Sequence, residues 1–118
     1  MIRFDVPTIN GDTDLLGRFW CAALGLVELE REDGNRWVLL GTTSGMRVLG
    51  LQSGMAQVGG IHLDLACDSE EFASQRLRLL SLGATEMRSA RNEQYGSIAN
   101  FADPHGNLFD LCAYKLPR

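Results

Sequence analysis

The chain has 118 residues and a formal net charge of -4, with 45% hydrophobic and 22% charged residues. Its length is that of one ordinary domain, and its composition is that of a folded globular protein. The acidic balance argues against nucleic acid or an anionic membrane surface as a partner, because both require a basic face.

The N-terminal residues and the cysteines favour a cytoplasmic protein. The chain begins Met-Ile-Arg-Phe-Asp, and no apolar run approaches the ~20 residues of a membrane-spanning helix. The sequence has three cysteines, Cys21, Cys67 and Cys112. None is part of a C-x-x-C motif, and none has a histidine next to it in the sequence. We therefore expect reduced, buried thiols.

The first half of the sequence predicts one strand, one helix and three further strands. Apolar residues alternate over residues 2–9, as in a half-buried strand. Asp12 is a candidate N-cap, and apolar residues at helical spacing run on to a stop at Gly25. Strands are expected at 26–32, 36–40 and 46–52, the first two joined by the turn Asp33-Gly34-Asn35.

The same order repeats after an unpatterned junction over residues 53–60. A strand is predicted over 61–66, followed by an N-cap at Ser69 and a helix over 70–82 that ends at Gly83. Three strands are expected at 85–89, 97–102 and 108–114, with a loop over 91–96. The last tight turn is Asp103-Pro104-His105-Gly106-Asn107, in which Asp103 and His105 are expected to shape the backbone.

The two halves therefore share one βαβββ plan. The predicted caps lie 57 residues apart and the two helix-ending glycines 58 apart. We predict an α+β fold with the helices on one face of a sheet. The chain would be a single domain over 1–118, with a first module at 1–52 and a second at 60–118.

Four stretches resemble the vicinal-oxygen-chelate superfamily, of the glyoxalase/bleomycin-resistance/dioxygenase type, and most closely its short glyoxalase-like branch. They are DTDLLGRFWCAALG at 12–25, GIHLDL at 60–65, LLSLGA at 79–84 and FADPHGNLFDL at 101–111. The resemblance implies a curled eight-stranded mixed sheet with helices on its convex face and a ligand in its concave one. It also implies a homodimer, which would cover exposed sheet edges.

The resemblance further implies a divalent metal, held by one side chain from the first and last strand of each module. Transferred by position, these side chains are Asp5, Gln52, His62 and Asp110. Aligning the fourth strand on its preceding turn instead replaces Gln52 by Gly50 and leaves three donors. An imidazole with carboxylate and amide oxygens suits Mn, Fe, Ni or Zn. Strand alternation puts His62 and Asp64 on one face.

Two functions that bind a small molecule remain open at this point, beside a third that does not. One is a metal-dependent enzyme, a lyase, isomerase or dioxygenase, whose ion binds two vicinal oxygens of a small substrate while Asp5 or Asp110 carries the proton. The other is a non-enzymatic, bleomycin-resistance-like protein that binds no metal and sequesters an aromatic molecule. Trp37, Asp64 and Tyr95 are predicted to line the ligand pocket. A pure interaction module is a third possibility if side chains fill that pocket.

Overall fold

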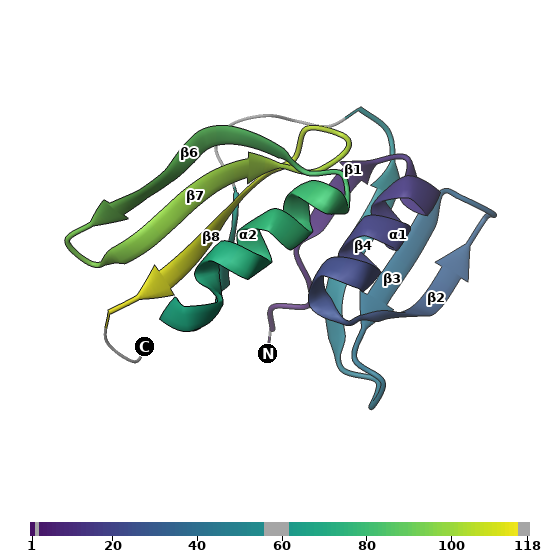
Figure 1. Ribbon diagram of the computed structural model, residues 1–118. Coiled ribbons are helices and arrows are strands. Elements are labelled where there is room, and N and C mark those ends of the chain that lie inside the picture. The colour runs from purple at the N-terminus through teal and green to yellow at the C-terminus, as the bar shows by residue number, and fades with distance from the viewer. Residues whose placement is uncertain (2, 56–61, 116–118) are drawn as a thin grey trace. The chain divides into compact units, whose positions relative to one another are not determined.

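The computed structural model describes residues 1, 3–55 and 62–115, and these form eight strands and two α-helices. They divide into two compact units, residues 1–57 and 58–118, each with a four-stranded mixed sheet and a helix (Figure 1). The predicted α+β fold with two βαβββ modules is confirmed. The strand starts predicted at Ile2 and Ile61, and the module start at Gly60, lie outside the described residues.

The first unit contains β1 (Thr8–Gly11), α1 (Thr13–Leu24), β2 (Val27–Glu32), β3 (Trp37–Gly41) and β4 (Arg47–Ser53). The strand order is β1-β4-β3-β2, with β1 parallel to β4 and the other pairs antiparallel. The carboxylate of Asp12 accepts hydrogen bonds from the backbone N–H groups of Asp14 and Leu15, both at 3.0 Å, and so caps α1. Gly25 follows with a left-handed φ of 67°, so both predicted helix boundaries are confirmed.

The first strand is shorter than predicted. It begins at Thr8 and ends at Gly11, whereas sequence alternation placed it over residues 2–9. Its register pairs Thr8 with Gly50 and Gly11 with Ser53. Alternation reports which side chains are apolar but not which backbone groups find a partner strand, and this explains the error.

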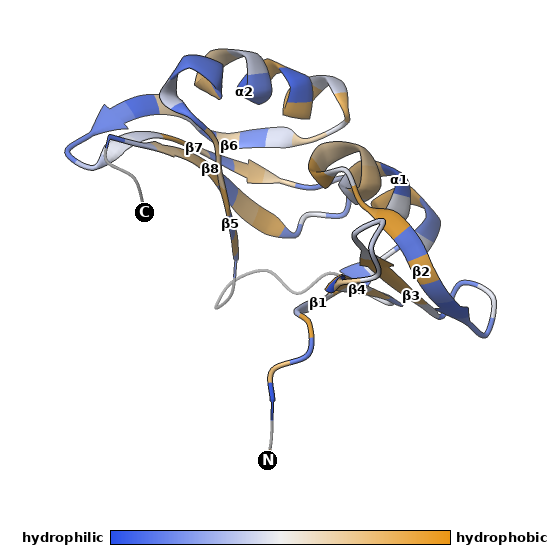
Figure 2. Cartoon of the chain, turned by 90° about the horizontal axis from the view of Figure 1, so that it is seen from below, coloured by the Kyte–Doolittle hydropathy of each residue, from blue (hydrophilic) through white to orange (hydrophobic). Residues whose placement is uncertain are grey.

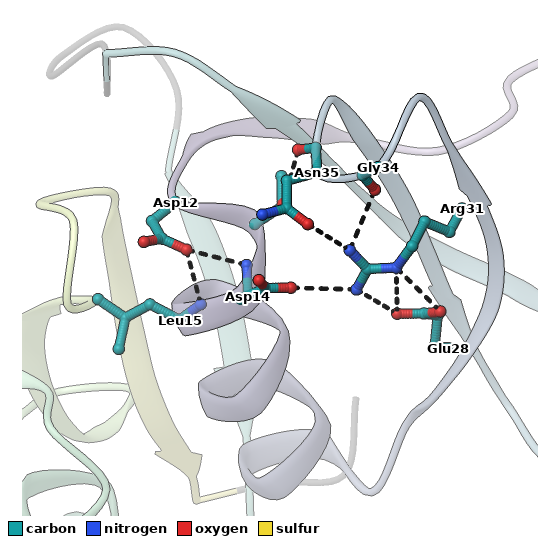
Figure 3. A network of polar contacts seen from close by, with 8 residues as sticks. Asp12, Asp14, Leu15, Glu28, Arg31, Gly34 and Asn35 are labelled. Atoms are coloured by element: carbon teal, nitrogen blue, oxygen red, sulfur yellow. Dashed lines mark hydrogen bonds and ion pairs between the residues drawn. The ribbon is translucent and has the colours of Figure 1, made fainter.

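A polar network ties the β2–β3 hairpin to the start of α1 (Figure 3). The guanidinium of Arg31 donates to Glu28 Oε1 at 2.6 Å and to Asn35 Oδ1 at 2.9 Å, and it lies 3.2 Å from Asp14 Oδ1. Thr13 Oγ1, at the first position of α1, donates to the backbone oxygen of Asn35 at 2.7 Å. These contacts fix where the hairpin turn meets the helix, although such exposed ion pairs add little stability individually.

The second unit repeats the plan with β5 (Leu63–Ala66), a 3-10 turn η1 (Ser69–Glu71), α2 (Phe72–Ser81), β6 (Thr85–Glu93), β7 (Gly96–Ala102) and β8 (Leu108–Tyr114). The strand order is β5-β8-β7-β6, with β5 parallel to β8. The predicted cap at Ser69 is wrong. Asp68 holds that position without a side-chain capping bond, and a 3-10 turn replaces the first turn of the predicted helix.

β6 is longer than predicted and includes part of the expected loop over 91–96. Its pairing with β7 extends to Asn92↔Ser97 and Glu93↔Gly96. The register shifts twice, between Glu86 and Arg88 and again before Arg91. Such irregularities interrupt the two-residue alternation, so the sequence pattern hid a strand that tertiary pairing maintains.

Each unit buries the face of its sheet that the helix covers. In the first unit Trp20 of α1 and Leu51 of β4 are both 0% exposed and belong to the core. In the second, Phe101 and Phe109 stack with ring centroids 5.3 Å apart. The inner strands β3, β7 and β8 are mainly hydrophobic, whereas β6 carries hydrophilic stretches (Figure 2). Neither helix in the described part of the chain has the length and apolar character that a membrane crossing requires.

A paired arginine and glutamate join α2 to β6 and give a pH prediction. Arg76 donates to both Glu86 oxygens, at 2.5 and 2.7 Å, and this bond holds the pKa of the Glu86 carboxyl below its usual 4.5. A lowered folded pKa stabilises the protein above the pKa of an unfolded glutamate, and the gain disappears as the pH falls through the folded value. Melting curves should show a lower Tm for Glu86→Gln than for wild type at pH 7, and this difference in Tm should disappear below about pH 4.

A matched control for this prediction is Glu70→Gln, which removes the same charge from an exposed position of the same unit. A difference between wild type and Glu86→Gln that persists unchanged in acid would contradict the assignment, because the pair would then stabilise through packing alone.

Candidate metal centre

A row of polar side chains crosses the second sheet on its open face, which we define as the face opposite the helix of the same unit. In β8 the buried Phe109 and Leu111 alternate with Asp110, so Asp110 lies on the open face. The register places Asp110 beside Asp64 of β5 on one side and Asn100 of β7 on the other. Three neighbouring strands thus contribute one polar residue each at the same level.

His62 completes this row into a cluster. Its Nε2 atom lies 3.0 Å from Asp64 Oδ1 and 3.3 Å from Asp110 Oδ2. The two-residue spacing of His62 and Asp64 puts both on the same face. The Asp110 side chain is only 16% exposed, whereas those of His62 and Asp64 are 51% and 60% exposed. The cluster therefore combines one largely buried carboxylate, that of Asp110, with two exposed members, His62 and Asp64.

The spacing of these donor atoms fits a divalent ion. One donor atom from each of His62, Asp64 and Asp110 lies within 4.8 Å of the other two. Two ligands at a right angle, each about 2.1 Å from an ion, are about 3.0 Å apart, close to the separations seen here. One imidazole with two carboxylates would satisfy three positions of Mn, Fe, Ni or Zn and leave others for water or substrate.

The cluster opens into a cavity of about 250 Å³. Tyr95 and Tyr114 line it with ring centroids 6.3 Å apart and ring planes tilted by 45°. Ile98 and Cys112 line it as well, so the cavity has apolar and aromatic walls around the His62 cluster. Asp64 and Tyr95, both predicted for the ligand pocket, therefore lie in one cavity with two of the predicted metal ligands.

Sequence reasoning missed Asn100. Its Nδ2 donates to Asp110 Oδ1 at 2.5 Å, and this bond anchors the carboxylate on the side away from His62. Asn100 and Asp110 are ten residues apart and meet only through the antiparallel β7–β8 register. An asparagine inside a mainly apolar strand was the available signal, because that residue type is depleted in strands.

The two remaining predicted ligands, Asp5 and Gln52, belong to the first unit. Arg47 binds Asp5 through both carboxylate oxygens, at 2.7 and 2.9 Å. This hydrogen bond holds the pKa of the Asp5 carboxyl below its usual range. A carboxylate with a lowered pKa is a poorer proton acceptor, which weighs against Asp5 as the proton carrier. Participation of Asp5 and Gln52 in a common site with His62 stays a prediction.

The open face of the first unit differs in chemistry from that of the second. The N-caps observed in the structure, Asp12 and Asp68, lie 56 residues apart. Aligning the two units with this offset matches Thr8 of the first with Asp64 of the second. The parallel-strand partners of Thr8 and Asp64 are Gly50 and Asp110. This alignment favours Gly50 over Gln52 as the counterpart of Asp110, and Gly50 offers no side-chain donor.

Trp37, predicted for the ligand pocket, occupies the space above Gly50. An ideal Cβ built at Gly50 would overlap the Trp37 ring and lie 2.7 Å from Thr8 Oγ1. Gly50→Ala is therefore expected to displace the ring and cost about 1–3 kcal/mol of unfolding free energy, as overpacking does. Urea denaturation followed by tryptophan fluorescence measures both effects.

Gly17→Ala in α1 is the matched control for this substitution. An ideal Cβ at Gly17 has only Leu51 Cδ1 nearby, at an ordinary contact distance of 3.8 Å. Gly17→Ala is therefore expected to raise the free energy of unfolding by about 0.5–1 kcal/mol through helix propensity. Equal effects of the two substitutions would contradict the packing of Trp37 on Gly50.

The three cysteines are free thiols, as predicted, but only Cys112 is buried as expected, whereas Cys21 and Cys67 are partly exposed. Burial is the main cause that raises the pKa of Cys21 and of Cys67, with the nearby carboxylates of Glu28 and Glu71 adding to it. A raised pKa keeps these two side chains in the unreactive thiol form.

Comparisons with known proteins agree with this fold. The model of the glyoxalase-like domain family matches residues 3–112. A glyoxalase-related enzyme from Fulvimarina pelagi has a TM-score of 0.75 at 20% identity, covering 96% of this chain and 88% of that one. A glyoxalase/bleomycin resistance protein/dioxygenase family enzyme from Burkholderia phytofirmans has a TM-score of 0.78 at 17% identity, covering 93% and 97%.

A third similar structure contains a metal. The fosfomycin resistance protein FosX from Listeria monocytogenes, in complex with Mn(II) and 1S,2S-dihydroxypropylphosphonic acid, has a TM-score of 0.78 at 20% identity, covering 98% of this chain and 94% of that one. At these identities the likeness concerns the fold. No curated protein matches the sequence.

Proposed function

The chain belongs to the glyoxalase-like domain family, and on this premise we propose that it is a divalent-metal-dependent enzyme acting on a small, oxygen-rich substrate. The observation that carries the proposal is the convergence of His62 Nε2, Asp64 Oδ1 and Asp110 Oδ2 in the lining of one cavity. The Mn(II) in the similar FosX structure supports a metal on this type of fold.

The bound ion would polarise two adjacent substrate oxygens and stabilise negative charge that develops on them. His62 and Asp110 would hold the ion. Asp64 either completes the set or carries the proton, and its exposed carboxylate suits both roles. The reaction would be of the lyase, isomerase or dioxygenase type. Tyr95 and Tyr114 would contact the carbon skeleton of the substrate.

A second candidate is a binding protein that sequesters an aromatic molecule without a metal. The two tyrosines beside the cluster favour it, because their faces and edges offer stacking contacts to a planar ligand. This second function requires no ion, so a measurement of metal binding distinguishes the two candidates. The homodimer, the single-domain organisation and the cytoplasmic location stay predictions.

Metal analysis and titration test the proposed function. The purified protein is analysed for Mn, Fe, Ni and Zn, stripped with a chelator, and titrated with Mn²⁺ by calorimetry. We expect one ion per chain, with affinity falling in acid because the ligands must be deprotonated. Absence of metal on purification together with absence of binding on titration would rule out the enzyme and favour the sequestering protein.

A further inference from the structure

Asn100 of β7 is bonded to the most buried member of the His62 cluster. Its Nδ2 donates to Asp110 Oδ1 at 2.5 Å across the β7–β8 pair. An ionised carboxylate only accepts hydrogen bonds, so the amide nitrogen must face Asp110. The amide oxygen of Asn100 consequently points the other way.

This orientation leaves a polar atom without compensation. Asn100 Oδ1 is buried, and no hydrogen-bond donor from the described residues reaches it. A buried acceptor without a donor costs free energy, and asparagine is a poor strand residue besides. An apolar side chain would serve the sheet better at this position. The other end of the amide, which holds Asp110, is therefore the end with a function.

The bond also decides which oxygen of Asp110 is available. Oδ1 is tied to Asn100, and Oδ2 lies 3.3 Å from His62 Nε2. Rotation of the carboxylate would break the bond to Asn100. We propose that Asn100 is a positioning residue that makes Asp110 a one-oxygen ligand, so that Oδ2 alone faces the ion. This inference rests on the proposed metal centre.

The test compares metal binding and stability in two substitutions. In Asn100→Leu the new side chain has nearly the same size as asparagine but has no hydrogen-bond donor. In Asn100→Ala the donor is removed without adding any larger apolar side chain. Mn²⁺ affinity is expected to fall about 10–100-fold in both, as when outer partners of metal ligands are removed. Tm should fall less in Asn100→Leu than in Asn100→Ala, because leucine refills the space that alanine leaves empty. The Co²⁺ absorption spectrum should change, because a freed carboxylate can bind through both oxygens.

The matched control is Ser97→Ala. It removes another side-chain hydrogen bond of β7, the one from Ser97 Oγ to Asn92 Oδ1 at 2.8 Å, and should leave Mn²⁺ affinity and the Co²⁺ spectrum unchanged. A wild-type Mn²⁺ affinity and Co²⁺ spectrum in Asn100→Leu would overturn the positioning role. Losses of Mn²⁺ affinity that are proportional to the loss of Tm across the two Asn100 variants would overturn it as well. Failure of the metal centre itself is recognised separately, because the wild-type protein would then bind no Mn²⁺.

Discussion

Replacing Asp110 by alanine is expected to abolish divalent-metal binding while the fold survives. Asp110 is the least exposed carboxylate of the cluster, with a side chain that is 16% exposed and contacts to both His62 and Asn100. Loss of a direct ligand should exceed the about 10–100-fold loss in affinity seen for outer partners. Stability should fall by about 1–3 kcal/mol, because the Asn100 amide loses its acceptor. Mn²⁺ titration and thermal melting measure the two effects.

Two further substitutions sharpen this test. His62→Ala should also abolish binding, but with little effect on Tm, because its side chain is 51% exposed. His105→Ala changes the other histidine of the sequence, which lies in the β7–β8 turn, and should leave metal binding intact. Lost stability with unchanged binding in Asp110→Ala would reject the site.

Replacing Asp103 by alanine should produce the largest loss of stability among these substitutions. Asp103 is 2% exposed, and its Oδ1 accepts from the backbone N–H groups of His105 at 2.9 Å and Asn107 at 3.0 Å. Its Oδ2 accepts from Asn107 Nδ2 at 2.9 Å. Alanine removes the acceptor of these hydrogen bonds, at about 1–3 kcal/mol for each buried one. We expect a total of about 3 kcal/mol or more from urea denaturation.

Asp68→Ala is the matched control, because Asp68 occupies a helix N-cap position without a side-chain capping bond. Its effect should stay within about 0.5 kcal/mol, as for ordinary surface changes. The β7–β8 turn also sets the register that places Asp110 opposite Asn100, so Asp103→Ala should weaken Mn²⁺ binding too. Equal stability of the Asp103 and Asp68 variants would contradict the role of Asp103 in the turn.

Local signals in the sequence were sufficient for α1 and for the turns. The Asp12 cap and the Gly25 stop of α1 lie where the sequence predicted them, and Asp103 shapes its turn through bonds to residues two and four positions away. Each of these features depends on contacts between residues close in the chain. Their chemistry can therefore be read without knowing the fold.

Strand boundaries depended on partners that the sequence does not reveal. β1 begins at Thr8 because Gly50, 42 residues later, pairs with it there. β6 continues to Glu93 because β7 supplies partners beyond two irregularities in the register. A strand exists only where another backbone accepts and donates its hydrogen bonds, and local alternation carries no information about that partner.

The sequence by itself determined the doubled βαβββ plan. Its family resemblance also proposed His62 and Asp110 as metal ligands, and that role stays a prediction. Only the tertiary structure decided which groups meet. It brought Asp110 to His62, bound Asn100 to Asp110, and paired Asp5 with Arg47. The physical reason is that a strand pattern gives the face on which a side chain lies, whereas the register between strands gives its neighbours. The register is settled by burial of the opposite, helix-covered face, which involves residues far along the chain.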